Sequence, residues 1–95
     1  MKYEISHERL CKVVEKYLDG FRWEQSVEKP SVNRIYLNDR LIMVAYTVMG
    51  KKRMLTVFKN YYQNLTNLFQ TDLEQCLIDW FNKNFHDSCE EIEIL

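Results

Sequence analysis

The first hydrophobic pattern along the chain has the period of an amphipathic helix. Between residues 10 and 18, apolar side chains recur every three or four positions, which places them on one helical face. Ser6 precedes this stripe and is suited to cap the helix. Asp19-Gly20 ends it, because glycine takes the left-handed conformation of a helix end at little cost. The stripe of this predicted helix consists of Leu10, Val13, Val14, Tyr17 and Leu18.

The pattern then changes to a period of two, which is typical of a β-strand with one wet face. Over residues 21–27, polar side chains such as Glu24 alternate with a second set of side chains, which points to the opposite face of the predicted strand. Pro30 ends this strand because it lacks the N–H that a strand ladder needs, and residues 28–33 are predicted to be a loop. The second set consists of Phe21, Trp23, Gln25 and Val27.

Three apolar runs follow, separated by short turns. The runs cover residues 34–37, 41–49 and 53–58, and the turns are Asn38-Asp39 and Gly50-Lys51. Both turns contain residues that tolerate the positive φ of a tight hairpin. The pattern therefore predicts a three-stranded antiparallel meander over residues 34–58.

Helical spacing returns over residues 59–85. Residues 60–69 are helix or loop, because several of them are poor helix formers. Thr71 and Glu74 have the spacing of a capping box, in which each side chain bonds the other's backbone N–H, and a wide apolar stripe follows them. The last residues alternate glutamate with isoleucine and predict a closing strand.

These elements predict one α+β domain over residues 1–95, in the order α-β-β-β-β-(α)-α-β. We expect an antiparallel sheet of four to five strands, with an N-terminal helix and one or two C-terminal helices. The middle strand is apolar on both sides, with Leu41, Met43 and Ala45 on one face and Ile42, Val44 and Tyr46 on the other. Two arrangements stay open: helices on both faces of the sheet, or helices on one face and a partner on the other.

Composition and charge are those of a globular domain. Of the 95 residues, 46% are hydrophobic and 28% are charged, and the formal net charge is -1. This balance excludes a disordered tail, a collagen-like repeat and a disulfide-dense toxin. The charge is uneven, because the first 60 residues hold 12 Lys or Arg against 7 Asp or Glu, and the last 35 hold 1 against 7.

The compartment follows from the apolar segments and the cysteines. No stretch is apolar enough for a transmembrane helix or a signal peptide, so we expect a cytoplasmic protein. Cys11, Cys76 and Cys89 are few and odd in number, which predicts reduced thiols. Cys76 lies on the apolar stripe of the last predicted helix and is expected to be a core residue. No Lys or Arg stands beside it to lower the pKa of its thiol, so we do not expect it to be a nucleophile.

Two charged segments are the candidate binding surfaces. The basic segment could grip nucleic-acid phosphates over the hairpin 51–59, or be a solvated turn that keeps a strand edge from pairing. The acidic segment lies at the C-terminal end, and it could meet the basic segment of a second copy. The residues are Lys51, Lys52, Arg53 and Lys59 in the basic segment and Glu90, Glu91 and Glu93 in the acidic segment.

Metal, cofactor and catalytic sites are not expected. His7 falls on the polar side of its helix, and the spacing of the potential ligands lacks the paired knuckle of zinc motifs. The two histidines lie among polar residues, and the two glycines are too far apart for a phosphate loop. We therefore predict no metal, no cofactor, no small-molecule substrate and no enzymatic activity. The potential zinc ligands are His7, Cys11, His86 and Cys89.

Three features mark the overall texture of the chain: the opening Met1-Lys2-Tyr3-Glu4-Ile5-Ser6, a middle rich in asparagine, tyrosine and lysine, and Trp80-Phe81-Asn82-Lys83-Asn84-Phe85 near the end. In these it resembles short uncharacterised proteins of tailed bacteriophages. The resemblance implies an accessory role: binding a host protein, inhibiting a defence system or assembling a virion. It also implies that the expected cytoplasm is that of the host. We predict a non-catalytic protein-binding domain that can form a homodimer. The alternative is a nucleic-acid-binding module that uses the hairpin 51–59.

Overall fold

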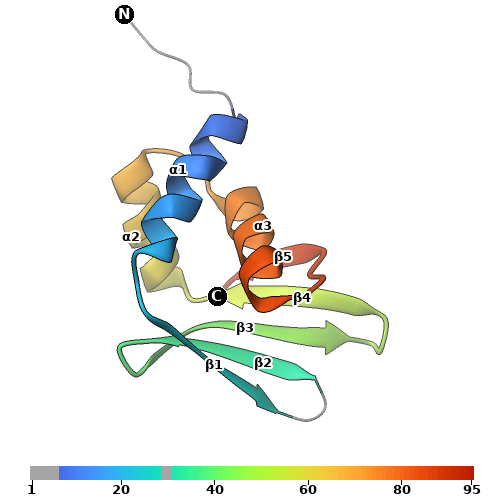
Figure 1. Ribbon diagram of the computed structural model, residues 1–95. Coiled ribbons are helices and arrows are strands. Elements are labelled where there is room, and N and C mark those ends of the chain that lie inside the picture. The colour runs from blue at the N-terminus through green and yellow to red at the C-terminus, as the bar shows by residue number, and fades with distance from the viewer. Residues whose placement is uncertain (1–6, 29–30) are drawn as a thin grey trace, which may run out of the picture.

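The computed structural model describes residues 7–28 and 31–95, and its elements follow the predicted order (Figure 1). The predicted cap Ser6 lies outside the described residues. Residues 59–69 form a helix, which resolves the choice between helix and loop. The elements are α1 (His7–Asp19), β1 (Trp23–Glu28), β2 (Val32–Leu37), β3 (Arg40–Val48), β4 (Lys52–Val57), α2 (Lys59–Phe69), α3 (Glu74–Phe85) and β5 (Glu91–Ile94).

The five strands form one mixed sheet in the order β1-β2-β3-β4-β5. The first four pair antiparallel as a meander, whereas β5 pairs parallel to β4. The prediction of an antiparallel sheet is therefore wrong for the last strand. The helix pair α2–α3 returns the chain to the beginning of β4, so that β5 runs in the same direction as β4.

The hairpin turns follow the chemistry of their residues, with one shift in position. Asn38 and Asp39 take φ values of 52° and 64°, as a tight hairpin requires. In the next hairpin the residues with positive φ are Met49 (53°) and Gly50 (67°), one position earlier than predicted. Glycine is favoured at the second of the two central positions, and β4 consequently begins at Lys52.

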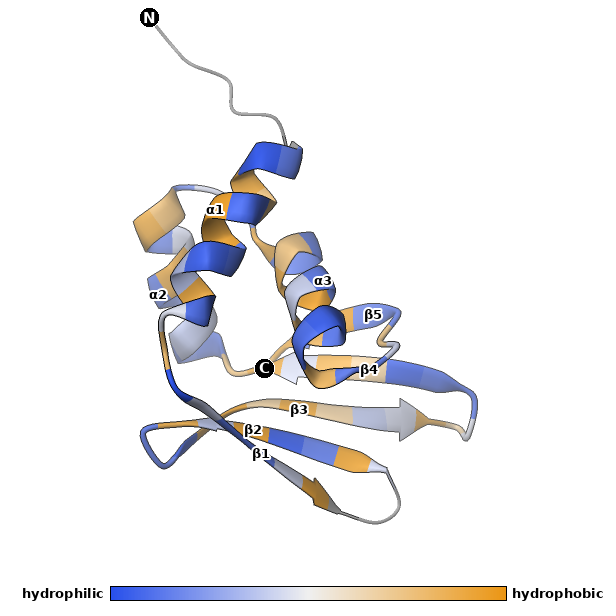
Figure 2. Cartoon of the chain, viewed as in Figure 1, coloured by the Kyte–Doolittle hydropathy of each residue, from blue (hydrophilic) through white to orange (hydrophobic). Residues whose placement is uncertain are grey.

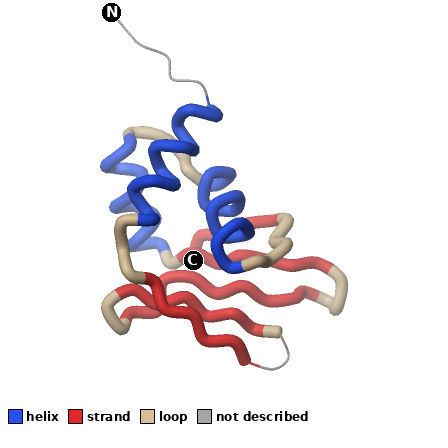
Figure 3. Tube along the Cα trace, viewed as in Figure 1, coloured by secondary structure: helices blue, strands red, loops and turns tan. Residues whose placement is uncertain are grey.

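All three helices lie on the same side of the sheet (Figures 1 and 3). The side chains that the central strands direct to this side are fully buried in the core, together with Val14 and Leu18 of α1 and Trp80 of α3. Of the two arrangements compatible with the sequence, the chain therefore adopts the one with an uncovered sheet face. The buried strand residues are Ile35, Met43, Ala45, Leu55 and Val57.

Helix α3 begins without the predicted capping box. Its N-cap position is Leu73 rather than Thr71, and no side chain caps it. Leu73 is 1% exposed, and its backbone N–H donates to the hydroxyl of Tyr62 at 3.2 Å. The burial of Leu73 beside Tyr62 thus places the start of the helix, and the capping-box prediction is wrong.

A disulfide joins α1 to α3, which contradicts the expectation of reduced thiols for two of the three cysteines. Cys11 and Cys76 are bonded across 65 residues of sequence, with their Cα atoms 4.9 Å apart. Sequence spacing cannot show this pairing, because the two thiols meet through the packing of α1 on α3. Cys89 is free, as predicted, and it is buried, while Cys76 is fully buried as expected of a core residue.

Candidate functional site

The two charged segments predicted as binding surfaces lie beside each other, because β4 and β5 are neighbours (Figure 2). The ammonium of Lys52 is 2.7 Å from a carboxylate oxygen of Glu91. This hydrogen bond, together with the charges of Glu91 and Glu90, raises the pKa of Lys52. Part of the basic segment is therefore neutralised by the acidic segment of the same chain.

The remaining predicted site residues are spread over the fold. Lys51 is exposed in the turn before β4, and Lys59 begins α2 beyond the other end of β4, about 20 Å along the strand. Glu90 is exposed, and its backbone N–H donates to the carbonyl of Arg53 at 3.0 Å. Glu93 lies on β5 and points away from the helices. The four basic residues consequently do not form one continuous patch.

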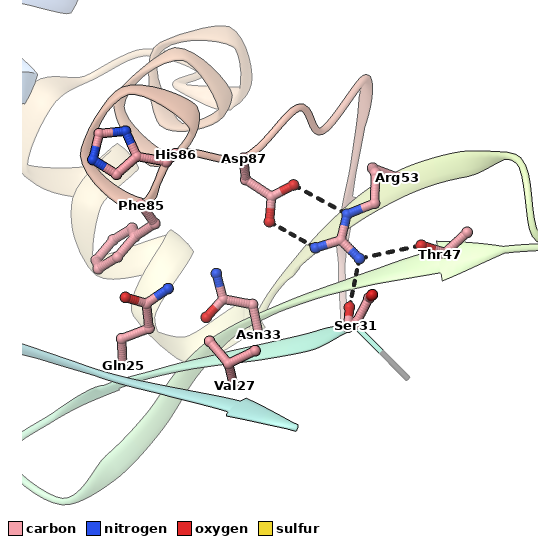
Figure 4. A pocket seen from close by; sticks show the side chains of 9 residues that line it. All are labelled: Gln25, Val27, Ser31, Asn33, Thr47, Arg53, Phe85, His86 and Asp87. Carbon is pink, nitrogen blue, oxygen red and sulfur yellow. Dashed lines mark hydrogen bonds and ion pairs between the residues drawn. The ribbon is translucent and has the colours of Figure 1, made fainter. Parts of the chain in front are cut away.

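Arg53 is the centre of a clamp between the sheet and the end of α3. Its Nε and Nη2 donate to the two carboxylate oxygens of Asp87 at 3.0 and 2.6 Å. Its Nη1 donates to the carbonyl of Ser31 at 2.6 Å and to the hydroxyl of Thr47 at 3.2 Å (Figure 4). Asp87 follows His86, which takes the left-handed conformation at the C-cap of α3. The clamp thus connects α3 with β4, with β3 and with the start of β2.

The charges of this clamp balance each other. Burial by itself would raise the pKa of Asp87. Hydrogen bonds from Arg53, from the backbone N–H of Ser88 and from the side chain of Asn33, together with the charge of Arg53, outweigh burial and lower this pKa below its ordinary value of 3.8. The hydrogen bond to Asp87 raises the pKa of Arg53. Both groups are therefore charged at neutral pH.

An open cavity of about 340 Å³ lies beside the clamp (Figure 4). Asn33 of β2 borders it and is 5% exposed, and its Oδ1 has no hydrogen-bond partner in the described part of the chain. The side-chain N–H group of Asn33 is turned to Asp87, and Oδ1 is turned to Gln25. The cavity is lined by Gln25, Val27, Ser31, Asn33, Thr47, Arg53, Phe85, His86 and Asp87.

Of the residues that line this cavity, only Arg53 was predicted from the sequence as a binding residue, and Asn33 and Asp87 are among those that the sequence did not mark. Asn33 fell into the predicted loop 28–33, although β2 begins at Val32 and the alternation of Asn33 with Ile35 marks it as a side chain of the helix-covered face. Asp87 follows α3 in a short polar segment. No local pattern links it to Arg53, which is 34 residues away.

The uncovered face of the sheet carries an apolar band. The strand register places Tyr36 opposite Leu41 and Tyr46 opposite Met54 on this face, and all four side chains are half-buried. The prediction that Leu41 shares a face with Met43 is therefore wrong, because the register shifts between Ile35 and Tyr36 and strict alternation is lost there. One row of paired positions crosses the face from β2 to β5. It has a cation at one end, an anion at the other and an uncharged centre. Its members are Arg34, Val44, Thr56 and Glu93.

A second apolar surface lies on the helices. Val13, Tyr17 and Phe21 are 54%, 39% and 40% exposed, and Leu68 of α2 is 56% exposed. The ring of Tyr17 makes edge contacts with Phe21 and with Phe69, at centroid distances of 5.1 and 5.6 Å. These contacts join α1 to α2 on the side of the molecule that carries the helices.

Two titratable groups outside the clamp have strongly raised pKa values. Burial raises the pKa of Tyr61, and it raises that of Cys89 to about 12, with a further contribution from the charge of Asp87.

Within residues 7–28 and 31–95, no three His, Cys, Asp or Glu residues lie together as a metal site requires, and no helix is long and apolar enough to cross a membrane. The chain matches no protein-family model, no curated protein and no solved structure.

Proposed function

We propose that this chain is a non-catalytic protein-binding domain that associates with a second copy of itself through the uncovered face of its sheet. The observation that supports this proposal is the apolar band on that face, opposite the three helices. An antiparallel sheet with one solvated face ordinarily alternates apolar and polar residues. Here Val44 and Tyr46 of β3 extend the apolar character to the uncovered side.

The charged row across the sheet supports a second copy as the partner. Arg34 and Glu93 are separated by β3 and β4, which is about 14 Å for neighbouring strands. A two-fold axis parallel to the strands reverses the strand order in the second copy, so Arg34 of each copy lies beside Glu93 of the other. The symmetry forms this pair twice. Packed sheets lie about 10 Å apart, within reach of two long side chains.

The size of the face predicts a reversible dimer. Five strands of about six residues span roughly 500 Å² per copy, or about 1,000 Å² for the pair. This area is at the lower limit of specific interfaces, where complexes are weak or transient. We therefore expect a monomer–dimer equilibrium that depends on protein concentration.

Analytical ultracentrifugation over a wide concentration range tests the proposal. The Val44→Glu variant is expected to remain monomeric, because it places a charge at the centre of the apolar band. Val13→Glu, on the second apolar surface, is the matched control and should dimerise like the wild type. A monomeric wild type at all concentrations, or a dimer that responds to Val13→Glu instead, would contradict the proposal. Circular dichroism verifies that each variant is folded.

A charge-reversal series tests the orientation of the two copies. Arg34→Glu and Glu93→Arg alone should each weaken the dimer about tenfold, and the double variant should restore it. Rescue can arise only between two copies, because the two positions are too far apart in one chain. If the loss of dimerisation free energy in the double variant equals the sum of the losses in the two single variants, this orientation is wrong.

The accessory viral role and the nucleic-acid-binding alternative stay predictions. The nucleic-acid alternative uses the hairpin 51–59, in which Lys52 and Arg53 already pair with carboxylates. If the purified protein binds nucleic acid, and Lys51→Glu combined with Lys52→Glu abolishes this binding, the alternative replaces the present proposal.

A further inference from the structure

The cavity beside the clamp lies next to an edge of the sheet. β1 is the first strand of the sheet order and pairs with β2 on one side. In an edge strand, every second residue turns its N–H and C=O outward, where an additional strand can pair with them. Two side chains of β1, Gln25 and Val27, line the cavity, so the edge and the cavity are continuous (Figure 4).

The charges in the cavity disfavour a charged ligand. Both carboxylate oxygens of Asp87 accept hydrogen bonds from Arg53, so a cationic ligand would meet the guanidinium without an open anionic partner. An anionic ligand would meet Asp87 and the unpaired oxygen of Asn33. Desolvating a charge that lacks a partner is costly. A neutral ligand therefore fits this cavity best.

Asn33 determines which polar group the ligand should carry. Its buried Oδ1 is an acceptor that has no partner in the described residues, and such an acceptor favours any ligand that brings an N–H or O–H donor. Gln25 faces Asn33 across the cavity with an amide that can donate and accept. A carboxamide group matches both residues, because it donates to Asn33 and exchanges a second hydrogen bond with Gln25.

The walls of the cavity suit the stem of such a side chain. Phe85 at the end of α3 and Val27 of β1 are apolar, and Val27 is 67% exposed. In a strand added to β1, alternate side chains point to the helix side, about 5 Å from those of β1. An asparagine or glutamine at one of these positions would have its methylene groups near Val27 and its amide in the cavity.

We propose that the edge of β1 and this cavity form a binding site for an extended peptide segment, which pairs with β1 as an additional strand and places a carboxamide side chain in the cavity. The site lies on the helix side of the sheet, opposite the proposed dimer face. It does not rest on the proposed function, and the two proposals can fail separately.

Peptide binding followed by heteronuclear NMR tests this site directly. The probe is a peptide of about seven residues in which threonine and valine alternate around a central glutamine. Binding should shift the backbone N–H signals of β1 and the side-chain amide signals of Asn33 and Gln25. Peptides with central glutamate, lysine or leucine should bind at least about tenfold more weakly, because none of them makes both hydrogen bonds without burying a charge.

Backbone methylation separates strand addition from side-chain binding alone. N-methylation of the glutamine peptide at the groups that face β1 should abolish binding, because it removes the donors of the new ladder. The site is rejected if the four peptides bind equally, if methylation has no effect, or if no signal of β1 shifts at the solubility limit of the glutamine peptide.

Two exposed positions and the buried Asn33 serve to locate the site, and circular dichroism verifies that each variant is folded. Val27→Asp should weaken the glutamine peptide at least about tenfold, because it puts a charge on the cavity wall. Met49→Asp is the matched control, since Met49 is 93% exposed and does not line the cavity. Asn33→Leu should remove the preference for glutamine over leucine. Equal effects of Val27→Asp and Met49→Asp would place the peptide elsewhere.

Discussion

Arg53 holds both carboxylate oxygens of Asp87, with Nε–Oδ1 at 3.0 Å and Nη2–Oδ2 at 2.6 Å, and so fastens the end of α3 to β4. The two side chains are 19% and 10% exposed. A two-point pair that is shielded from water is stronger and more directional than a single surface contact. Neighbouring Lys52 and Glu91 make such a surface contact, with side chains 47% and 50% exposed.

Removal of the Arg53 side chain is expected to destabilise the domain. Arg53→Ala leaves Asp87 without its cation and breaks the hydrogen bonds to Ser31 and Thr47, which we expect to cost about 2–3 kcal/mol of the free energy of unfolding. Urea denaturation measures this change. Lys52→Ala is the control and should leave the free energy of unfolding unchanged, because its pair is exposed. Equal losses in both variants would show that the clamp has no special role.

The clamp also predicts how stability depends on pH. The pKa of Asp87 is lowered in the folded state, so the folded protein binds this proton less readily than the unfolded chain does. Its contribution is present in full above the unfolded value of 3.8 and is lost as the pH falls through the lower folded pKa. The stability advantage of the wild type over Asp87→Asn should therefore shrink below about pH 4. An advantage that is constant from neutral to strongly acidic pH would contradict this assignment.

The disulfide between α1 and α3 should contribute strongly to stability. Closing a loop of 65 residues restricts the unfolded chain by about 4 kcal/mol in the loop-entropy model. A reductant should lower the melting temperature of the wild type to that of Cys11→Ala/Cys76→Ala and should not affect the double variant. If the reductant does not change the wild type, the two thiols are already reduced, as the cysteine count alone suggested.

The element order could be predicted because local chemistry marks most of the turns between elements. Asn38 and Asp39 take the positive φ that their residue types favour, and Gly50 supplies the next turn. The direction of β5 could not be predicted in the same way. Residues 90–95 show an alternating pattern and nothing that identifies their neighbour, and parallel pairing with β4 depends on where α2 and α3 return the chain.

The candidate site could be predicted only in part, because its contacts join residues that are far apart in sequence. The charge of Arg53 marked it as a candidate, but its partner Asp87 is 34 residues away. Similarly, the apolar phase of Cys76 indicated burial, whereas its bond to Cys11 depends on how two helices pack. A single sequence shows which side chains share a face of each helix or strand. It does not show which helices and strands pack against one another.

Cys89 should be an unreactive thiol in the folded protein. It is 4% exposed, and burial raises its pKa to about 12, to which the charge of Asp87 contributes. At pH 8 about one molecule in ten thousand would carry the reactive thiolate. A thiol reagent should therefore detect no rapidly reacting cysteine in the native protein.

Reaction with the same thiol reagent in denaturant is the control for this prediction. Unfolding without reductant should expose one thiol, that of Cys89, and unfolding after reduction should expose all three. Rapid reaction of a single thiol in the native state would mean that Cys89 is accessible and its pKa ordinary. Three reactive thiols before reduction would instead remove the disulfide and leave the burial of Cys89 untouched, so the two features are tested independently.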